Sequence, residues 1–134
     1  TAVFSSELST KAIIEGVRSG RVFIDIANTP GATLDLAAHA GPQTANMGGS
    51  VALGPGEAVT VDMLTSGLPE GAAITLIGYN IAIDGLGTVR LDQAPKQVHV
   101  TLRPGAASGY IRPEIRDRNR IILMIGNPLY LTAR

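Results

Sequence analysis

The chain has no cysteine, no tryptophan and only two histidines in 134 residues. The absence of cysteine excludes disulfides, thiol nucleophiles and thiolate metal sites. The two histidines, His39 and His99, form no His-x-His or His-Glu-x-x-His motif, which are common signs of a metal site. Each lies on the polar phase of an alternating stretch, so we expect two exposed strand histidines rather than a shared site.

Charged and aromatic side chains are also scarce, which reduces the number of partner classes that the chain can bind. The formal net charge is zero, so the chain lacks the overall field that attracts nucleic acid or an anionic membrane. No apolar run approaches the roughly 18 residues that cross a bilayer. Aromatic residues make up 4%, which argues against a sugar-stacking platform or a binder of single-stranded nucleic acid. We therefore expect no nucleic acid and no membrane as a partner.

Apolar residues, by contrast, are abundant at 45%, against 16% charged residues. Such a chain either buries its apolar surface in its own core or covers part of it with a neighbour. The chain begins with Thr1 rather than Met and has no signal-peptide pattern, so we expect it to be a piece of a longer protein. These residues assign no cellular compartment.

Residues 9–20 contain the one stretch with clear helical periodicity. Ser9 or Thr10 can cap its start, and Gly20 stands where a glycine commonly ends a helix. Its apolar positions, Ile13, Ile14 and Val17, fall on one stripe. Because so short a helix is marginal on its own, we expect this stripe to dock on another surface.

From residue 21 onward the apolar residues alternate with a period of two, which is typical of strands. A long apolar strand is expected over residues 73–84, followed by an Asp84-Gly85 hairpin turn into a strand over 88–92. In all, about eight or nine short strands are separated by turn signals. This pattern predicts an all-β fold, an antiparallel β-sandwich of immunoglobulin-like or jelly-roll-like type, preceded by one short N-terminal helix. We divide the chain into a junction helix within 1–20 and a sandwich domain over 21–134.

No residue pattern in the chain predicts catalysis. A serine elbow is missing, and the glycines of residues 48–56 match no phosphate-binding loop. We therefore expect no catalytic, cofactor-binding or metal-binding residue in this chain. Asp25 is unusual because it lies within an apolar strand, and we expect it to form a structural ion pair with Arg21 or with an arginine of another strand.

The last 26 residues predict a hairpin. Within 110–116, Tyr110 and the residues at 112, 114 and 116 alternate with Ile111, Pro113 and Ile115, so one face is expected to be wet and the other buried. Asn119 is the expected left-handed residue of the turn, and the apolar run 121–125 predicts a strand covered on both faces. Two interpretations of the wet face are open. It is either a basic face for phosphate or an acidic partner, or the charged side of an edge hairpin. Its arginines are Arg112, Arg116, Arg118 and Arg120.

Three pieces of the sequence together resemble one known family. They are Ile14-Glu-Gly-Val-Arg-Ser-Gly-Arg-Val-Phe-Ile24, Gly109-Tyr-Ile-Arg-Pro-Glu-Ile-Arg-Asp117 and Gly126-Asn-Pro-Leu-Tyr-Leu131. They are similar to the C-terminal part of metal-dependent hydrolases of the PHP (polymerase and histidinol phosphatase) superfamily, in the branch of the carbaryl-hydrolase-like proteins. In that branch a helix leaves the catalytic domain and enters an accessory β-sandwich. One departure is the Asp25-Ile-Ala-Asn-Thr-Pro30 stretch, where relatives often have an Asn-Gly-Pro turn.

The resemblance implies that this chain is a non-catalytic accessory domain, with the upstream catalytic domain of the same polypeptide as its partner. Divalent metal ions would be held by His and Asp in that upstream domain, which would cleave phosphoester or related bonds. A homo-oligomer is left open. The alternative is a free-standing binding module for carbohydrate or a protein, using the loops at 41–56 and 66–71. The candidate interdomain surface consists of Ile13, Ile14, Val17, Arg112, Arg116, Arg118 and Arg120.

Overall fold

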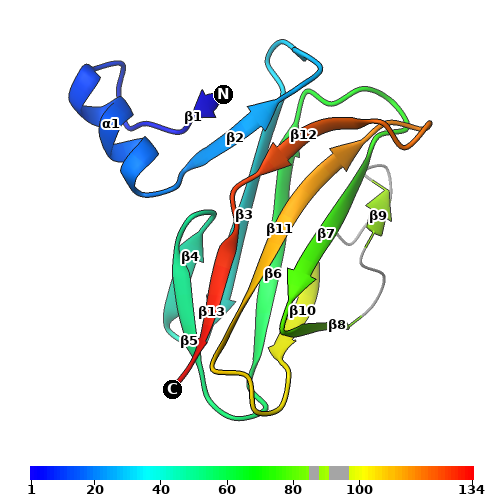
Figure 1. Cartoon of the computed structure of the whole chain (residues 1–134). Coiled ribbons are helices and arrows are strands. Elements are labelled where there is room, and N and C mark those ends of the chain that lie inside the picture. The colour runs from blue at the N-terminus through cyan, green and yellow to red at the C-terminus, as the bar shows by residue number, and fades with distance from the viewer. Residues whose placement is uncertain (85–87, 91–96) are drawn as a thin grey trace.

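Two β-sheets face each other in the computed structural model, which describes residues 1–84, 88–90 and 97–134 (Figure 1). The eight-stranded sheet, here called sheet A, consists of β1 (Ala2–Val3), β2 (Val22–Asp25), β5 (Ser50–Leu53), β7 (Ala73–Tyr79), β9 (Thr88–Arg90), β11 (Ser108–Arg116), β12 (Ile122–Gly126) and β13 (Leu129–Ala133). The five-stranded sheet, sheet B, consists of β3 (Thr33–Ala40), β4 (Gln43–Asn46), β6 (Ala58–Ser66), β8 (Ile81–Asp84) and β10 (Gln97–Leu102). The expected all-β class and antiparallel sandwich are confirmed, although β13 and β5 pair in parallel.

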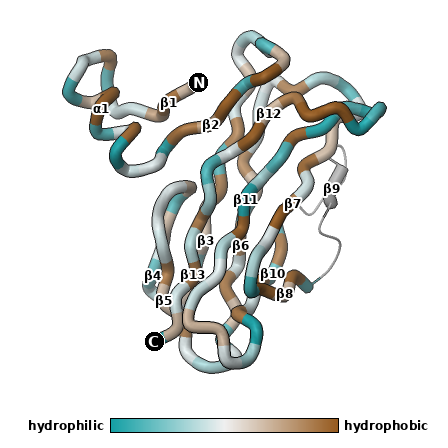
Figure 2. Tube along the Cα trace, viewed as in Figure 1, coloured by the Kyte–Doolittle hydropathy of each residue, from teal (hydrophilic) through white to brown (hydrophobic). Residues whose placement is uncertain are grey.

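The core lies between the sheets and is filled by alternate residues of the strands, as the period of two requires. Leu34, Leu36 and Ala38 of β3 point inward and are completely buried. Ile111 and Ile115 of β11 meet them from sheet A and are equally buried. Figure 2 shows apolar residues recurring along most of the strands. Each fully buried Leu or Ile side chain contributes about 1.5–3 kcal/mol through removal from water, so the sandwich has its own source of stability.

The strands are more numerous than the eight or nine that we expected, for a reason that sequence periodicity does not reveal. Residues 73–84 were expected to form one strand, but the backbone turns at Asn80, which has a φ of 54°. The chain then leaves β7 in sheet A and continues as β8 in sheet B. The expected turn at Asp84-Gly85 lies partly outside the described residues. The strand that follows it, β9, pairs with β7 and not with β8. Residues 41–56, which the binding-module alternative treats as a loop, likewise hold two strands, β4 and β5.

The β11 strand is central in sheet A, which excludes the edge-hairpin interpretation of its charged face, although β11 and β12 do form the expected hairpin. It pairs with β7 on one side, and on the other with β13 over residues 108–111 and with β12 over residues 114–116. The Asn127-Pro128 dipeptide separates β12 from β13, and Pro113 of β11 lies opposite this break, where its missing N–H costs no ladder bond on that side. The following turn also differs from expectation, because Arg120 rather than Asn119 has the left-handed backbone, with a φ of 67°.

Candidate functional site

The N-terminal segment of residues 1–20, here called the arm, projects from one corner of the sandwich (Figure 1). It contains β1 and the helix α1 (Thr10–Arg18). The side chain of Ser9 caps α1 by accepting a hydrogen bond from the N–H of Ala12 at 3.2 Å, and Gly20 follows the helix with a φ of 70°. The expected helix and both of its end signals are therefore confirmed.

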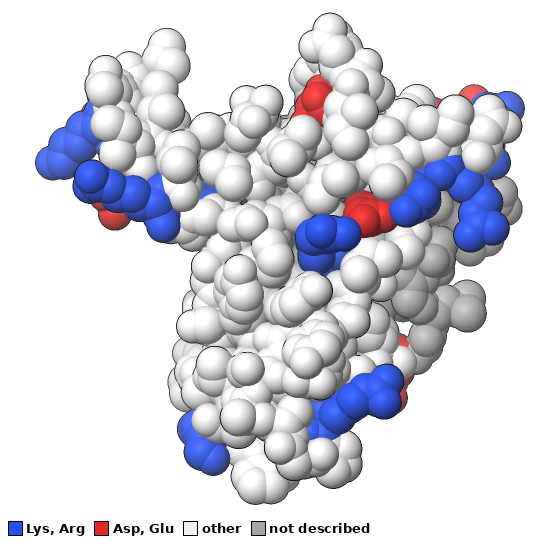
Figure 3. All heavy atoms as spheres, viewed as in Figure 1, with Lys and Arg blue, Asp and Glu red and all other residues white. Residues whose placement is uncertain are grey.

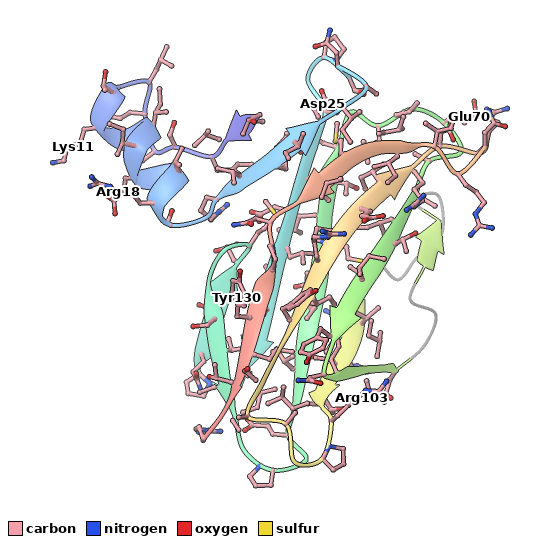
Figure 4. The ribbon with its side chains drawn as sticks, viewed as in Figure 1. Lys11, Arg18, Asp25, Glu70, Arg103 and Tyr130 are labelled. Carbon is pink, nitrogen blue, oxygen red and sulfur yellow. The ribbon has the colours of Figure 1, made fainter. Side chains whose placement is uncertain are left out.

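The helix faces β1 with a glycine rather than with its apolar stripe. A Cβ atom on Gly16 would lie 2.4 Å from the carbonyl oxygen of Phe4 and 2.7 Å from Cγ1 of Val3, so no larger side chain fits at this contact. The stripe lies elsewhere on the helix, where Ile13, Ile14 and Val17 are 36%, 45% and 53% exposed. Lys11 and Arg18 also point away from the sheets (Figure 4). The stripe that we expected to dock is uncovered in this chain.

The arm joins the sandwich where two backbones touch. The side-chain amide of Asn127 donates a hydrogen bond to the carbonyl of Gly20 at 3.0 Å, across 107 positions of sequence. Beside it, Gly48 donates its N–H to the carbonyl of Pro128 at 2.8 Å. A Cβ on Gly48 would lie 2.3 Å from the carbonyl oxygen of Ser19, so glycine is required here. Two of the three sequence pieces that carry the family resemblance thus meet at this junction.

A partly buried ion pair fixes the first residue after the arm. Nη2 of Arg21 lies 2.5 Å from Oδ2 of Asp35 on β3, and Asp35 is only 7% exposed. Burial raises the pKa of the Asp35 carboxyl, while the Arg21 charge and the N–H of Leu36 oppose that rise. The guanidinium of Arg21 also lies 5.0 Å from the centre of the Phe4 ring, within cation–π range. The pair therefore links the arm, sheet A and sheet B.

The expected ion pair of Asp25, with Arg21 or with an arginine of another strand, is wrong among the described residues. Oδ2 of Asp25 instead accepts a hydrogen bond from the N–H of Thr29 at 2.7 Å, within the turn that follows β2. Its other oxygen, Oδ1, is buried without a hydrogen-bond partner. Asp25 therefore stabilises a turn, and Asp35, which the sequence analysis did not single out, is the partner of Arg21.

Two of the four candidate arginines form a second charged group on the outer face of sheet A. Arg112 and Arg116 each place an Nη2 atom 2.7 Å from one oxygen of Glu114, which lies between them on β11. Glu114 is only 4% exposed, so the expected wet face is wrong at this position. Each carboxylate oxygen has a charged donor, which is the condition under which a carboxylate can be buried.

The side chains of the other two arginines do not join this group, although the carbonyl of Arg120 accepts a hydrogen bond from Nη1 of Arg116 at 3.0 Å. Arg118 and Arg120 are exposed in the turn between β11 and β12, at the end of β12 that is remote from the Asn127 junction. Arg118 lies over Gly71 of the loop between β6 and β7, with Nε 3.6 Å from the position of an added Cβ. The four arginines therefore do not make one basic face.

A cavity of about 250 Å³ opens on the outer face of sheet A beside the junction. It is bordered by residues 22–24 of β2, by Arg112 and by residues 125–128. These segments come from all three of the sequence pieces that carry the family resemblance. At its border, Nη2 of Arg112 binds Glu114, and Nε of Arg112 is buried without a hydrogen-bond partner.

The histidines are exposed, as expected, but strand pairing brings them to one face. His39 of β3 and His99 of β10 are both in register with Thr60 of β6. Nε2 of His39 lies 3.1 Å from Oδ2 of Asp62, and Nδ1 of His99 lies 3.3 Å from the Thr60 hydroxyl. Among the described residues, no three or more His, Asp or Glu side chains are grouped so that they could hold a metal ion.

A second, larger cavity of about 530 Å³ lies at the end of the sandwich opposite the arm. The tight turns 54–57 and 103–106 border it, together with the last two residues. Arg103, which Figure 4 shows at this end, donates from Nε to the carbonyl of Ile81 at 3.1 Å. The loop at 66–71 lies at the other end of β6, so it cannot form one site with this cavity.

A scan of the chain against protein-family models finds no match, and a search of curated proteins finds none. The family resemblance therefore rests on the three sequence pieces.

In the part of the chain that the structure describes, no helix combines the length and the apolar character needed to cross a membrane.

Proposed function

We propose that this chain is a non-catalytic accessory β-sandwich of a PHP-type metal-dependent hydrolase, docked on the catalytic domain of the same polypeptide through its arm. One observation carries the docking part of the proposal. The apolar stripe Ile13, Ile14 and Val17 is exposed on a helix that meets β1 through a glycine. A helix of nine residues gains most of its stability from packing, so a neighbour that covers the stripe stabilises both partners.

The geometry of the junction supports the same role. Two glycine backbones in contact, the Asn127 amide and the Arg21–Asp35 pair fix the start of β2 against the sandwich. A rigid joint of this kind holds a docked domain at a defined orientation. The hydrolase part of the proposal rests on the three sequence pieces, and the divalent metal ions would be held by the upstream domain.

The test compares the isolated chain with a longer polypeptide that includes the residues encoded before Thr1. We expect phosphoester hydrolysis that depends on a divalent metal in the longer polypeptide and none in the isolated chain. Amide hydrogen exchange in α1 should be at least ten-fold slower in the longer polypeptide, because docking covers the helix. Substantial metal-dependent esterase activity at one active site per isolated chain would refute the proposal.

A matched pair of substitutions tests the stripe itself. Val17→Glu places a charge on the stripe, whereas Lys11→Glu introduces the same residue on a side of α1 that points away from the sheets (Figure 4). We expect Val17→Glu to restore fast exchange in α1 of the longer polypeptide and Lys11→Glu to leave it slow. Equal behaviour of the two variants would show that the stripe is not the docking surface.

The cavity opposite the arm favours a second candidate function, a binding module for carbohydrate or another small ligand. Its volume of about 530 Å³ is within the range of small-molecule sites, and Arg103 and Arg134 could supply polar contacts. Titration of the isolated chain with oligosaccharides, followed by NMR, tests this candidate. Saturable shifts that Ala106→Trp abolishes, and that Thr44→Trp preserves, would support it. Their absence across a broad oligosaccharide panel would count against it.

A further inference from the structure

All three tyrosines of the chain lie in one row across the outer face of sheet A. Tyr110 of β11 is directly opposite Tyr79 of β7 on one side and Tyr130 of β13 on the other. The rings of Tyr79 and Tyr110 stack with centroids 5.9 Å apart and planes 24° from parallel. Tyr79 is 60% exposed and Tyr130 is 43% exposed. Aromatic side chains contribute most to binding when a partner buries them, so this row is an exposed surface whose burial would favour association.

Two exposed isoleucines lie on the same face, in rows that also contain the charged side chains of β11. Ile77 of β7 is opposite Arg112, and Ile24 of β2 is opposite Ile125 of β12. Ile24 and Ile77 are exposed. Figure 3 views this face directly and shows a line of charged side chains crossing it, with mostly uncharged residues below that line. Tyrosine, arginine and large apolar residues are the types enriched in the cores of protein interfaces, where lysine and acidic residues are depleted.

The face is continuous with the arm. β2 follows the arm directly and presents Ile24 beside the cavity, and Arg112 lies at the other border of that cavity. Two residues before Arg112 on β11 is Tyr110, the middle residue of the tyrosine row. A single body that covers the arm's base therefore also reaches the cavity and the tyrosines. The cavity would accept one apolar side chain of such a body.

We propose that the outer face of sheet A, from the cavity to the tyrosine row, is the seat of the catalytic domain of the same polypeptide. This inference rests on the proposed function and deepens it, because it names the surface on which the docked domain lies. The Arg112–Glu114–Arg116 line carries a formal charge of +1, from two arginines and one glutamate. An acidic partner surface complements it, whereas a second copy of this chain would oppose two lines of like charge.

Chemical labelling of the tyrosines tests the proposal. Nitration by tetranitromethane, followed residue by residue with mass spectrometry, is compared between the isolated chain and the longer polypeptide. We expect Tyr79 and Tyr130 to react at least ten-fold more slowly in the longer polypeptide. Protection that is lost on dilution would overturn the proposal, because it would assign the face to a second copy of the chain.

The same samples separate this inference from the proposed function. Slow exchange in α1 together with fast nitration of Tyr79 and Tyr130 would leave the docked arm standing and refute the sheet A surface. Fast exchange and fast nitration would refute both. A variant pair adds a second measurement. In the longer polypeptide, Tyr79→Glu should increase the rate of limited proteolysis next to the arm at least five-fold. Leu64→Glu, on the exposed face of sheet B, should leave that rate unchanged.

Discussion

The sandwich and the arm use the same kinds of apolar side chain and treat them differently. Leu36 and Val61 of the sandwich are completely buried between two sheets, while Ile14 and Val17 of the arm are about half exposed. The sandwich therefore supplies its own core, and the arm supplies a surface. Under the proposed function, the docked catalytic domain covers this surface of the arm.

The largest expected contrast comes from truncating one side chain in each region. Leu36→Ala removes a fully buried side chain and should cost about 2–5 kcal/mol in the free energy of unfolding. Ile14→Ala in the isolated chain should change it by no more than about 0.5 kcal/mol, because the side chain is exposed. Urea unfolding of the two variants measures both values. A cost for Ile14→Ala close to that of Leu36→Ala would mean that the stripe is already covered in the isolated chain.

A smaller contrast comes from two glycines with similar backbones. Gly31 and Gly48 have φ values of 75° and 87°, so alanine costs about 1–2 kcal/mol at either position through the left-handed conformation alone. A Cβ on Gly31 meets nothing within 4 Å, whereas a Cβ on Gly48 meets the backbone of Ser19 and Gly20. Gly48→Ala should therefore cost about 1–3 kcal/mol more than Gly31→Ala, as expected for overpacking.

The two glycine variants also differ in where the damage should appear. Gly48→Ala pushes on the base of the arm, so limited proteolysis of the folded variant should cut within residues 1–20 faster than in the unchanged chain. Gly31→Ala, in a turn of the sandwich, should leave that rate as it was. Equal costs and equal cleavage would show that the arm yields without resistance and that the junction is not rigid.

The sequence predicted the parts of the fold that depend on local signals. The cap at Ser9, the glycine at position 20 and the period of two are each set within a few residues, and the helix and the sandwich class followed from them. The break of residues 73–84 at Asn80 was missed, since an apolar alternating run continues on both sides of it. Nothing in periodicity indicates that a strand changes sheet there.

The candidate site depends on distant pairings, and much of it could not be predicted. The exposed stripe on α1 was found because helical spacing shows it. Arg112 and Arg116 were named, but their burial of Glu114 follows from the central place of β11, which only the sheet order reveals. Tyr79 and Tyr130 join Tyr110 through the register of three strands, and Asp35 reaches Arg21 across the two sheets. No local signal marks either arrangement.

The smallest expected effect is a difference in pH dependence between the two ends of the molecule. Burial holds the pKa of Asp35, at the junction, above its ordinary 3.8, against the influence of Arg21. At the opposite end, the N–H of Gly54 and then Arg134 hold the pKa of Glu57 below its ordinary 4.5. The folded state thus binds the Asp35 proton more tightly than the unfolded state does, and the Glu57 proton less tightly.

The two carboxyls should therefore act on stability with opposite signs. The Asp35 contribution falls as pH rises from 3.8 through its folded pKa, and the Glu57 contribution, complete above 4.5, is lost as pH falls through its folded pKa. Urea unfolding from pH 3 to pH 7 of Asp35→Asn and Glu57→Gln separates them. Asp35→Asn lowers the whole curve by leaving Arg21 unpaired, but it should also remove the decline just above pH 4. Glu57→Gln should remove part of the acid loss instead. The two variants could instead change the slope of unfolding free energy against pH with the same sign. That result would show that the Arg21–Asp35 pair, like Arg134–Glu57, gains more from its charges than burial costs. The junction would then be no more strained than the far end.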